Sequence, residues 1–173
     1  MEVALLEKTS LKIKSKSSNF VVDPFEKITK TAADAVIALT KDGLDFSKIS
    51  DFRVIIKSPG EYEVGGIKVS GIDIDGNTVY DLKIDNVAVI LAKSSSLSKV
   101  SEKLKEYDVV ICQVDGEVNQ GVITALEPRV VIFYGENAAE AAKSLGKESL
   151  AAMQKYSVTE DKLPEEMQVV VLK

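Results

Sequence analysis

The chain has 173 residues, of which 45% are hydrophobic and 28% are charged. These proportions are typical of an ordinary globular protein, and we expect one domain over residues 1–173. The net charge is −5, and the 22 basic residues are scattered among 27 acidic ones. This pattern argues against a nucleic-acid-binding face, which needs a concentrated positive patch. No apolar run approaches the roughly 18 residues that span a bilayer, so we expect no membrane contact.

The chain contains one cysteine, Cys112, and no histidine. An intrachain disulfide is therefore impossible. The first residues also lack the long apolar core of a secretory signal, so we expect a reducing, cytoplasmic setting. Zinc sites built from cysteine and histidine are excluded by the counts, as is histidine acting as a base. Cys112 lies between apolar residues in VVICQV, and we interpret it as a small buried hydrophobic side chain.

Short strands and glycine turns make up most of the first half. LKIKSK alternates apolar and polar residues, which is typical of a half-exposed strand. Asp23-Pro24 ends a strand, because proline has no N–H for the ladder. Gly65-Gly66 and Asp75-Gly76-Asn77 predict tight hairpins. We predict strands at residues 3–6, 11–16, 20–22, 35–40, 52–57, 61–64, 67–72, 79–84 and 87–92, and one helical turn within 25–31.

The second half alternates helices and strands. Leu97, Val100 and Leu104 recur at helical spacing, after serines that can cap a helix. Asn137 is placed to cap an alanine-rich helix, and Gly146 to end it in the left-handed conformation. We predict helices within residues 96–107 and at 120–126, 138–145 and 149–155, and strands at 107–114, 129–134 and 168–172. The fold class we expect is α+β: two packed, mainly antiparallel sheets flanked by a few helices, an αββα sandwich.

The order of these elements resembles the metallo-β-lactamase fold, in particular its small bacterial and archaeal members described as zinc-dependent hydrolases. The similar motifs are SPGEYEVGGIKVSGI at 58–72, the strand ending in Asp23-Pro24, the strand-to-loop step at 33–46, Glu127-Pro128-Arg129 before a strand, and LPEEMQVVVL at 163–172. The resemblance covers nearly the whole chain. It implies a two-sheet sandwich and a metal site in the loops that follow the strands.

The metal-ligand pattern of that family, Thr-His-x-His-x-Asp-His, reads TKDGLDF here. Its three histidine positions hold Lys41, Gly43 and Phe46. The regions of the later ligands read ILAK at 90–93 and FYG at 133–135. The resemblance therefore implies a vestigial site formed by Thr40, Lys41, Asp42, Gly43, Asp45, Phe46, Lys93 and Tyr134. An ammonium at position 41 would repel a metal, while Gly43 and Phe46 offer no donor atom, so we expect no zinc and no cofactor.

Four carboxylates leave a different metal site open. Asp42 and Asp45 follow the central strand, and Asp115 and Glu117 lie in the loop VDGEVN. Such a set could hold magnesium or calcium if it converged. The competing interpretation is that acids in glycine-bearing loops form turns and solvated surface. For Asp45 this means a capped turn, or a pair with Lys41, and we favour it.

The leading functional hypothesis is a non-catalytic protein of the metallo-β-lactamase fold with a binding or assembly role. It would act on an unknown protein partner or by self-association, for example through an exposed sheet edge. One alternative is a hydrolase with a rebuilt carboxylate site, whose magnesium- or manganese-dependent activity would be lost on Asp45→Ala. Another is a small-molecule or nucleotide sensor that uses the vacated pocket.

Overall fold

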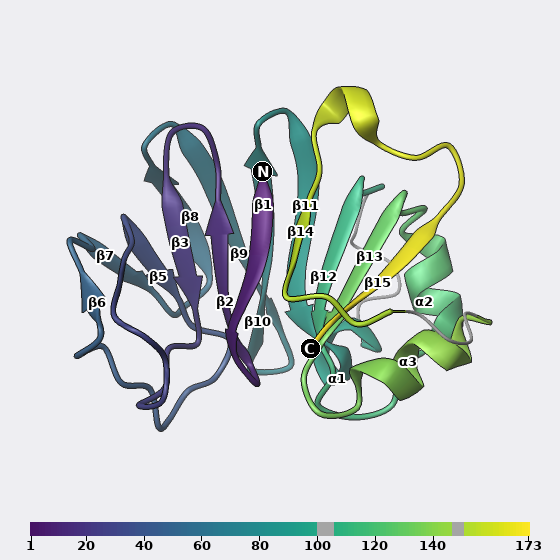
Figure 1. Ribbon diagram of the computed structural model, residues 1–173, viewed down its shortest axis with the longest axis horizontal. Helices are drawn as coiled ribbons and strands as arrows, with labels where there is room; N and C mark the ends of the chain where they lie inside the picture. The colour runs from purple at the N-terminus through teal and green to yellow at the C-terminus, as the bar shows by residue number, and fades with distance from the viewer. Residues whose placement is uncertain (100–105, 147–150) are drawn as a thin grey trace.

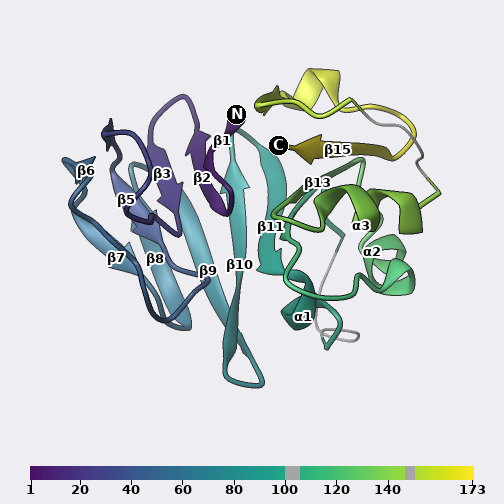
Figure 2. The same cartoon turned by 60° about the horizontal axis from the view of Figure 1, so that its bottom comes forward.

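The computed structural model describes residues 1–99, 106–146 and 151–173. Two β-sheets pack face to face, and the helices lie against the outer face of the second sheet (Figures 1 and 2). The expected two-sheet sandwich is confirmed, with the helices gathered on one side of it. No helix in the described ranges is long and apolar enough to cross a membrane.

The first sheet combines antiparallel and parallel strands. Its spatial order is β14 (Lys155–Ser157), β1 (Glu2–Glu7), β2 (Ser10–Lys14), β3 (Asn19–Val22), β5 (Ala35–Ile37) and β7 (Val54–Ile56). The neighbours from β14 to β3 run antiparallel, and β3, β5 and β7 run parallel. The strand predicted at 35–40 ends early, at Ile37, because the chain turns there toward Asp23.

The second sheet is also mixed. Its spatial order is β15 (Gln168–Leu172), β13 (Val130–Tyr134), β12 (Val109–Gln113), β11 (Val87–Lys93), β10 (Asn77–Ile84), β9 (Ile67–Ile74) and β8 (Gly60–Val64). Strands β8 to β11 form the expected antiparallel meander, whereas β11, β12, β13 and β15 are parallel. Parallel neighbours need long crossovers, and the alternating second half of the chain supplies them.

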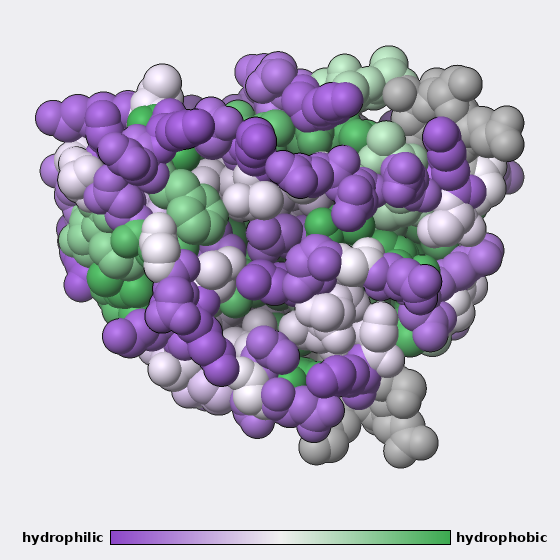
Figure 3. Space-filling model, turned by 90° about the horizontal axis from the view of Figure 1, so that it is seen from below, coloured by the Kyte–Doolittle hydropathy of each residue, from purple (hydrophilic) through white to green (hydrophobic). Residues whose placement is uncertain are grey.

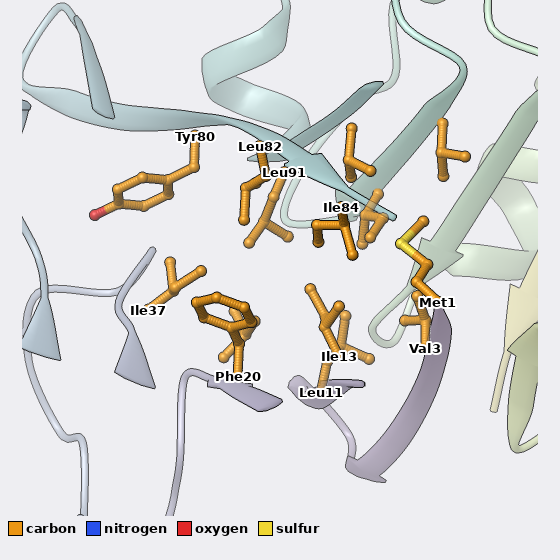
Figure 4. Close-up of a cluster of buried hydrophobic side chains, with 14 of the residues drawn as sticks. Met1, Val3, Leu11, Ile13, Phe20, Ile37, Tyr80, Leu82, Ile84 and Leu91 are labelled. Carbon is orange, nitrogen blue, oxygen red and sulfur yellow. The ribbon is translucent and has the colours of Figure 1, made fainter. Parts of the chain in front are cut away.

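Alternating residues of both sheets fill the space between them. Figure 4 shows this core, with side chains from the two sheets meeting face to face. The labelled members, all at most 8% exposed, are Met1, Val3, Leu11, Ile13, Phe20 and Ile37 on one side and Tyr80, Leu82, Ile84 and Leu91 on the other. The intervening residues of the second sheet form a separate apolar cluster beneath the helices. This two-sided burial explains the unbroken apolar runs of β11 to β13.

The helices are shorter than predicted. They are α1 (Ser94–Leu97), α2 (Gln120–Ala125) and α3 (Ala138–Ser144), followed by a 3₁₀ turn, η1 (Glu160–Lys162). Gly146 has the expected left-handed φ of 73°. The Asn137 cap is wrong, because its side chain accepts no capping hydrogen bond, whereas Asn119 caps α2 by accepting from the Val122 N–H. Half of the predicted helix at 96–107, residues 100–105, lies outside the described residues.

The helix predicted at 149–155 is wrong in its described part, whereas the turn predicted within 25–31 is present as a single hydrogen-bonded turn. Residues 151–154 form no helix, and β14 (Lys155–Ser157) pairs with β1. Within 25–31, Phe25 and Ile28 close a single turn, and the chain enters β4 (Thr31–Ala32), which pairs with β6 (Ile49–Ser50). This segment lies against the outer face of the first sheet and buries an apolar cluster there.

Tyr80 links the second sheet to the ends of two strands of the first. Its buried hydroxyl donates to the carbonyl oxygens of Ala38 (3.1 Å) and Ile56 (3.2 Å). We predict that Tyr80→Phe lowers the free energy of unfolding by about 1–2 kcal/mol, because a buried carbonyl loses its donor. Urea denaturation measures the change as a lower midpoint at an unchanged m-value.

Tyr62→Phe is the matched control, since the Tyr62 hydroxyl donates to the Ser58 carbonyl at the exposed surface (3.0 Å). We expect it to change stability by less than about 0.5 kcal/mol. Equal effects of the two substitutions would contradict this role of Tyr80.

Candidate functional site

The parallel strands of the second sheet end in a row of aligned side chains. Lys93 is the register partner of Gln113, Gln113 of Tyr134, and Tyr134 of Leu172. The residues two positions earlier in these strands belong to the core between the sheets, so strand alternation turns this row toward the first sheet as well. Lys93, Gln113 and Tyr134 thus bring polar groups to this end of the core, beside the apolar Leu172.

The row is largely closed to solvent. Tyr134 is 0% and Gln113 6% exposed, and Lys93 is half-buried. Among the described residues, the Tyr134 hydroxyl and Gln113 Oε1 have no hydrogen-bond partner. Burial, reinforced by the negative charge of Asp23, raises the pKa of Tyr134 well above its usual value. Tyr134 is therefore a neutral phenol that can donate a hydrogen bond.

Asp23 faces this row from the end of β3 in the first sheet. It is fully buried, with a left-handed φ of 44°. Its Oδ1 accepts from the backbone N–H groups of Leu39 (2.8 Å) and Thr40 (3.0 Å), and its Oδ2 accepts from the Thr40 hydroxyl (2.7 Å). The Ser10 hydroxyl donates to the Asp23 carbonyl. These bonds fix the start of the loop that follows β5.

Burial raises the pKa of Asp23, although the hydrogen bonds from Thr40 and Leu39 and the positive charge of Lys93 act in the opposite direction. A buried carboxylate is disfavoured relative to its protonated form unless charge or hydrogen bonds compensate it. For Asp23 the effect of burial outweighs these donors and the charge of Lys93, so the net pKa is raised.

Asp115 approaches the same strand ends from the loop after β12. Its Oδ1 accepts from the Ser94 hydroxyl (2.9 Å) and the Ser95 N–H (3.0 Å), and its Oδ2 accepts from the Ser95 hydroxyl (2.7 Å). Partial burial raises the pKa of Asp115, but the bonds from Ser95 and Ser94 and the charge of Lys93 outweigh burial, and the net pKa is lowered. Lys93 therefore acts electrostatically on both carboxylates.

The loop after β5 separates into two parts. Lys41, Asp42 and Gly43 are exposed. Asp45 Oδ1 accepts from the Ser47 N–H (2.8 Å), which confirms the capped turn. Phe46 turns toward the outer face of the first sheet, where its ring centroid lies 6.1 Å from that of Phe52.

The predicted site residues are therefore only partly brought together. Thr40, Lys93 and Tyr134 gather around Asp23. Lys41, Asp42 and Gly43 line a neighbouring pocket of about 430 Å³. The Asp45 carboxylate instead accepts a hydrogen bond within its own turn, from Ser47. Figure 3 shows the end of the molecule where these strands finish, with hydrophilic side chains over most of it and apolar side chains between them on both sides of the view.

Sequence reasoning missed two members of this site. The sequence pattern marks Asp23 only as the end of a strand. The signal that could have found it is the adjacent Pro24, because an Asp-Pro step indicates a sharp turn of the chain. Gln113 was overlooked because it ends an apolar strand. A polar residue at the last buried position of a parallel strand points into the site at that sheet edge.

The carboxylate metal site is not formed in the described part of the chain. No group of three acidic or cysteine side chains there is arranged to hold a metal ion. The carboxylates of Asp45 and Asp115 accept hydrogen bonds from nearby serines. Asp42 and Glu117 are exposed on different loops. Zinc and iron need imidazole, thiolate or carboxylate ligands, whereas the strand-end row offers an ammonium, an amide and a neutral phenol. These residues do not fit the metal centre that the fold resemblance implies.

The pKa of Asp23 generates a test. Because its folded-state pKa is raised, its contribution to the free energy of unfolding is present below the unfolded pKa of about 4 and is lost as the pH rises through the folded pKa. We predict that Asp23→Asn, which mimics the protonated form, becomes more stable relative to wild type as the pH increases from 4 to 7. Urea denaturation across this range measures the difference.

Asp42→Asn removes the same charge at an exposed position and is the control. Wild type gaining stability over Asp23→Asn with rising pH would contradict the assigned shift.

Solved structures with a similar architecture come from several organisms. A Thermotoga maritima protein of the metallo-β-lactamase superfamily, assigned as a zinc-dependent hydrolase, superposes with a TM-score of 0.75 at 21% identity, covering 99% of this chain and 98% of the other. A protein assigned as a metal-dependent hydrolase from Parabacteroides distasonis gives 0.68 at 15% identity, covering 99% and 93%. CmlA, a diiron β-hydroxylase from Streptomyces venezuelae, gives 0.60 at 10% identity, covering 91% and 54%.

The sequence comparisons are less informative. No family model matches the chain. Phosphate-binding protein PstS 2 of Streptococcus agalactiae is 29% identical over 119 residues, which covers 65% of this chain and 36% of that protein. The chain thus spans little more than a third of the length of the curated relatives it matches. Taken with the strand order described above, the structural comparisons lead to one conclusion: the chain has the metallo-β-lactamase fold.

Proposed function

We propose that this chain is a non-catalytic protein of the metallo-β-lactamase fold that works by binding rather than by metal-dependent hydrolysis. The observation that carries the proposal is the position of Lys93. It stands at the end of β11, where its positive charge opposes the raised pKa of buried Asp23 and helps to lower the pKa of Asp115 in the loop after β12. A lysine ammonium therefore supplies positive charge to the carboxylates at this edge.

The remaining residues of the row support the same proposal. Gln113 and Tyr134 are buried beside Lys93 and present an amide and a neutral phenol. Neither group is a usual zinc ligand. A catalytic zinc also needs an open coordination position for the water that it activates, whereas side chains close this edge.

Metal content and turnover test the proposal. We expect protein purified from zinc- and iron-supplemented cultures to hold far less than one metal ion per chain by mass spectrometry, and to hydrolyse neither β-lactam, ester nor phosphodiester substrates. Added zinc should leave the thermal unfolding midpoint unchanged, since a ligand at 100 times its dissociation constant would add about 2.7 kcal/mol to the free energy of unfolding. Stoichiometric metal with turnover would overturn the proposal.

The role of Lys93 has its own test. We predict that Lys93→Met lowers the free energy of unfolding at pH 7 by about 1 kcal/mol relative to Lys93→Arg, because both variants keep a long side chain but only arginine keeps the charge. Chemical denaturation measures the difference. If the two variants are equally stable, Lys93 does not compensate the carboxylates.

A further inference from the structure

A pocket of about 430 Å³ lies beside the candidate site, between the loop that follows β5, the end of β7 and the start of β10. Two kinds of side chain meet in it. Apolar groups come from both sides of the loop and from β7, and polar groups stand at its margin. The lining residues used below are Lys41, Leu44, Phe46, Ile55, Lys57 and Asn77.

The charged side chains of the pocket are two lysines and one aspartate. Lys41 and Lys57 are exposed, and the ion pairs between side chains in the described residues involve other lysines, namely Lys8, Lys99 and Lys155. Together with Asp42, the lysines give the pocket a net charge of about +1 at neutral pH. The whole chain carries −5, so this pocket is electrostatically unlike the average surface.

The apolar part of the pocket is held by packing. Leu39 is only 8% exposed, and Leu44, Phe46 and Ile55 are partly exposed. The Phe52 ring packs against that of Phe46, which fixes one wall. A ligand entering here would cover apolar surface that now contacts water, and the hydrophobic effect would favour its binding.

We propose that this pocket binds a small amphipathic organic anion, with its apolar body against Leu44, Phe46 and Ile55 and its anionic group between Lys41 and Lys57. The proposal rests on the binding role proposed above and names the ligand class for it. The lysines select the anion through charge-assisted hydrogen bonds, and Asn77 at the start of β10 offers a further hydrogen-bonding group. Asp42 disfavours a second negative charge on its side of the pocket.

Two fluorescent probes separate the two parts of the proposal. Anilinonaphthalene sulfonate carries an anionic group on an aromatic body, and N-phenyl-1-naphthylamine is its neutral counterpart. Titrations of the folded wild-type protein in EDTA should show saturable binding of the sulfonate, and weaker binding of the neutral probe. Inorganic phosphate alone should compete poorly, because it has no apolar body.

Substitutions locate the site. Lys41→Gln/Lys57→Gln should weaken binding of the sulfonate by about tenfold, the size of one lost charged hydrogen bond, and leave the neutral probe unchanged. Leu44→Ala should weaken both probes. Lys83→Gln, which removes an exposed charge from β10 outside the pocket, should change neither, and thermal unfolding checks that each variant remains folded.

The results distinguish this proposal from the preceding one. Wild-type affinity for the sulfonate in Lys41→Gln/Lys57→Gln, or the absence of saturable binding, would overturn the pocket and leave the non-catalytic proposal standing. Metal with hydrolytic turnover would overturn the non-catalytic proposal, while binding in EDTA would still support the pocket.

Discussion

The carboxylate of Asp23 holds together the end of β3, the end of β5 and the loop that leaves the first sheet. It accepts hydrogen bonds from Leu39 and from both donors of Thr40, while its backbone N–H donates to the Ile37 carbonyl. A buried carboxylate is stable only with such partners. The loop geometry, the position of the pocket and the approach of the first sheet to the strand-end row therefore all depend on this one group.

Charge balance at this edge follows from the same constraint. Two carboxylates, Asp23 and Asp115, approach from different loops, and both are partly desolvated. Their local hydrogen bonds compensate much of the cost, and Lys93 supplies positive charge to both. In a metal-dependent relative of this fold a cation would serve that purpose. In this chain the side chain of Lys93 provides that positive charge. This is why we infer a binding role in place of metal chemistry.

The sequence predicted those parts of the site that depend on strand patterns. The apolar runs that end near Lys93 and Tyr134 are predicted as strands, and the structure confirms them as β11 and β13. The family resemblance, and not the strand pattern, assigned these two residues to the site. The capped turn of Asp45 is local and was also foreseen. The role of Asp23 was not, because its partner Thr40 lies 17 residues away and only the tertiary fold brings them together. The helix predicted at 149–155 is wrong in its described part because the backbone of β14 pairs with β1, and such long-range pairing overrides local helical spacing.

The register of the strand-end row has a consequence for engineering. Lys93, Gln113, Tyr134 and Leu172 project from neighbouring strands of one ladder, so their Cα positions are set by backbone pairing and not by their side chains. New side chains can therefore be installed at these four positions while the backbone stays in place. Point substitutions in this row would therefore place new side-chain groups at positions that the sheet backbone fixes. The twist of the sheet would set the spacing between these groups.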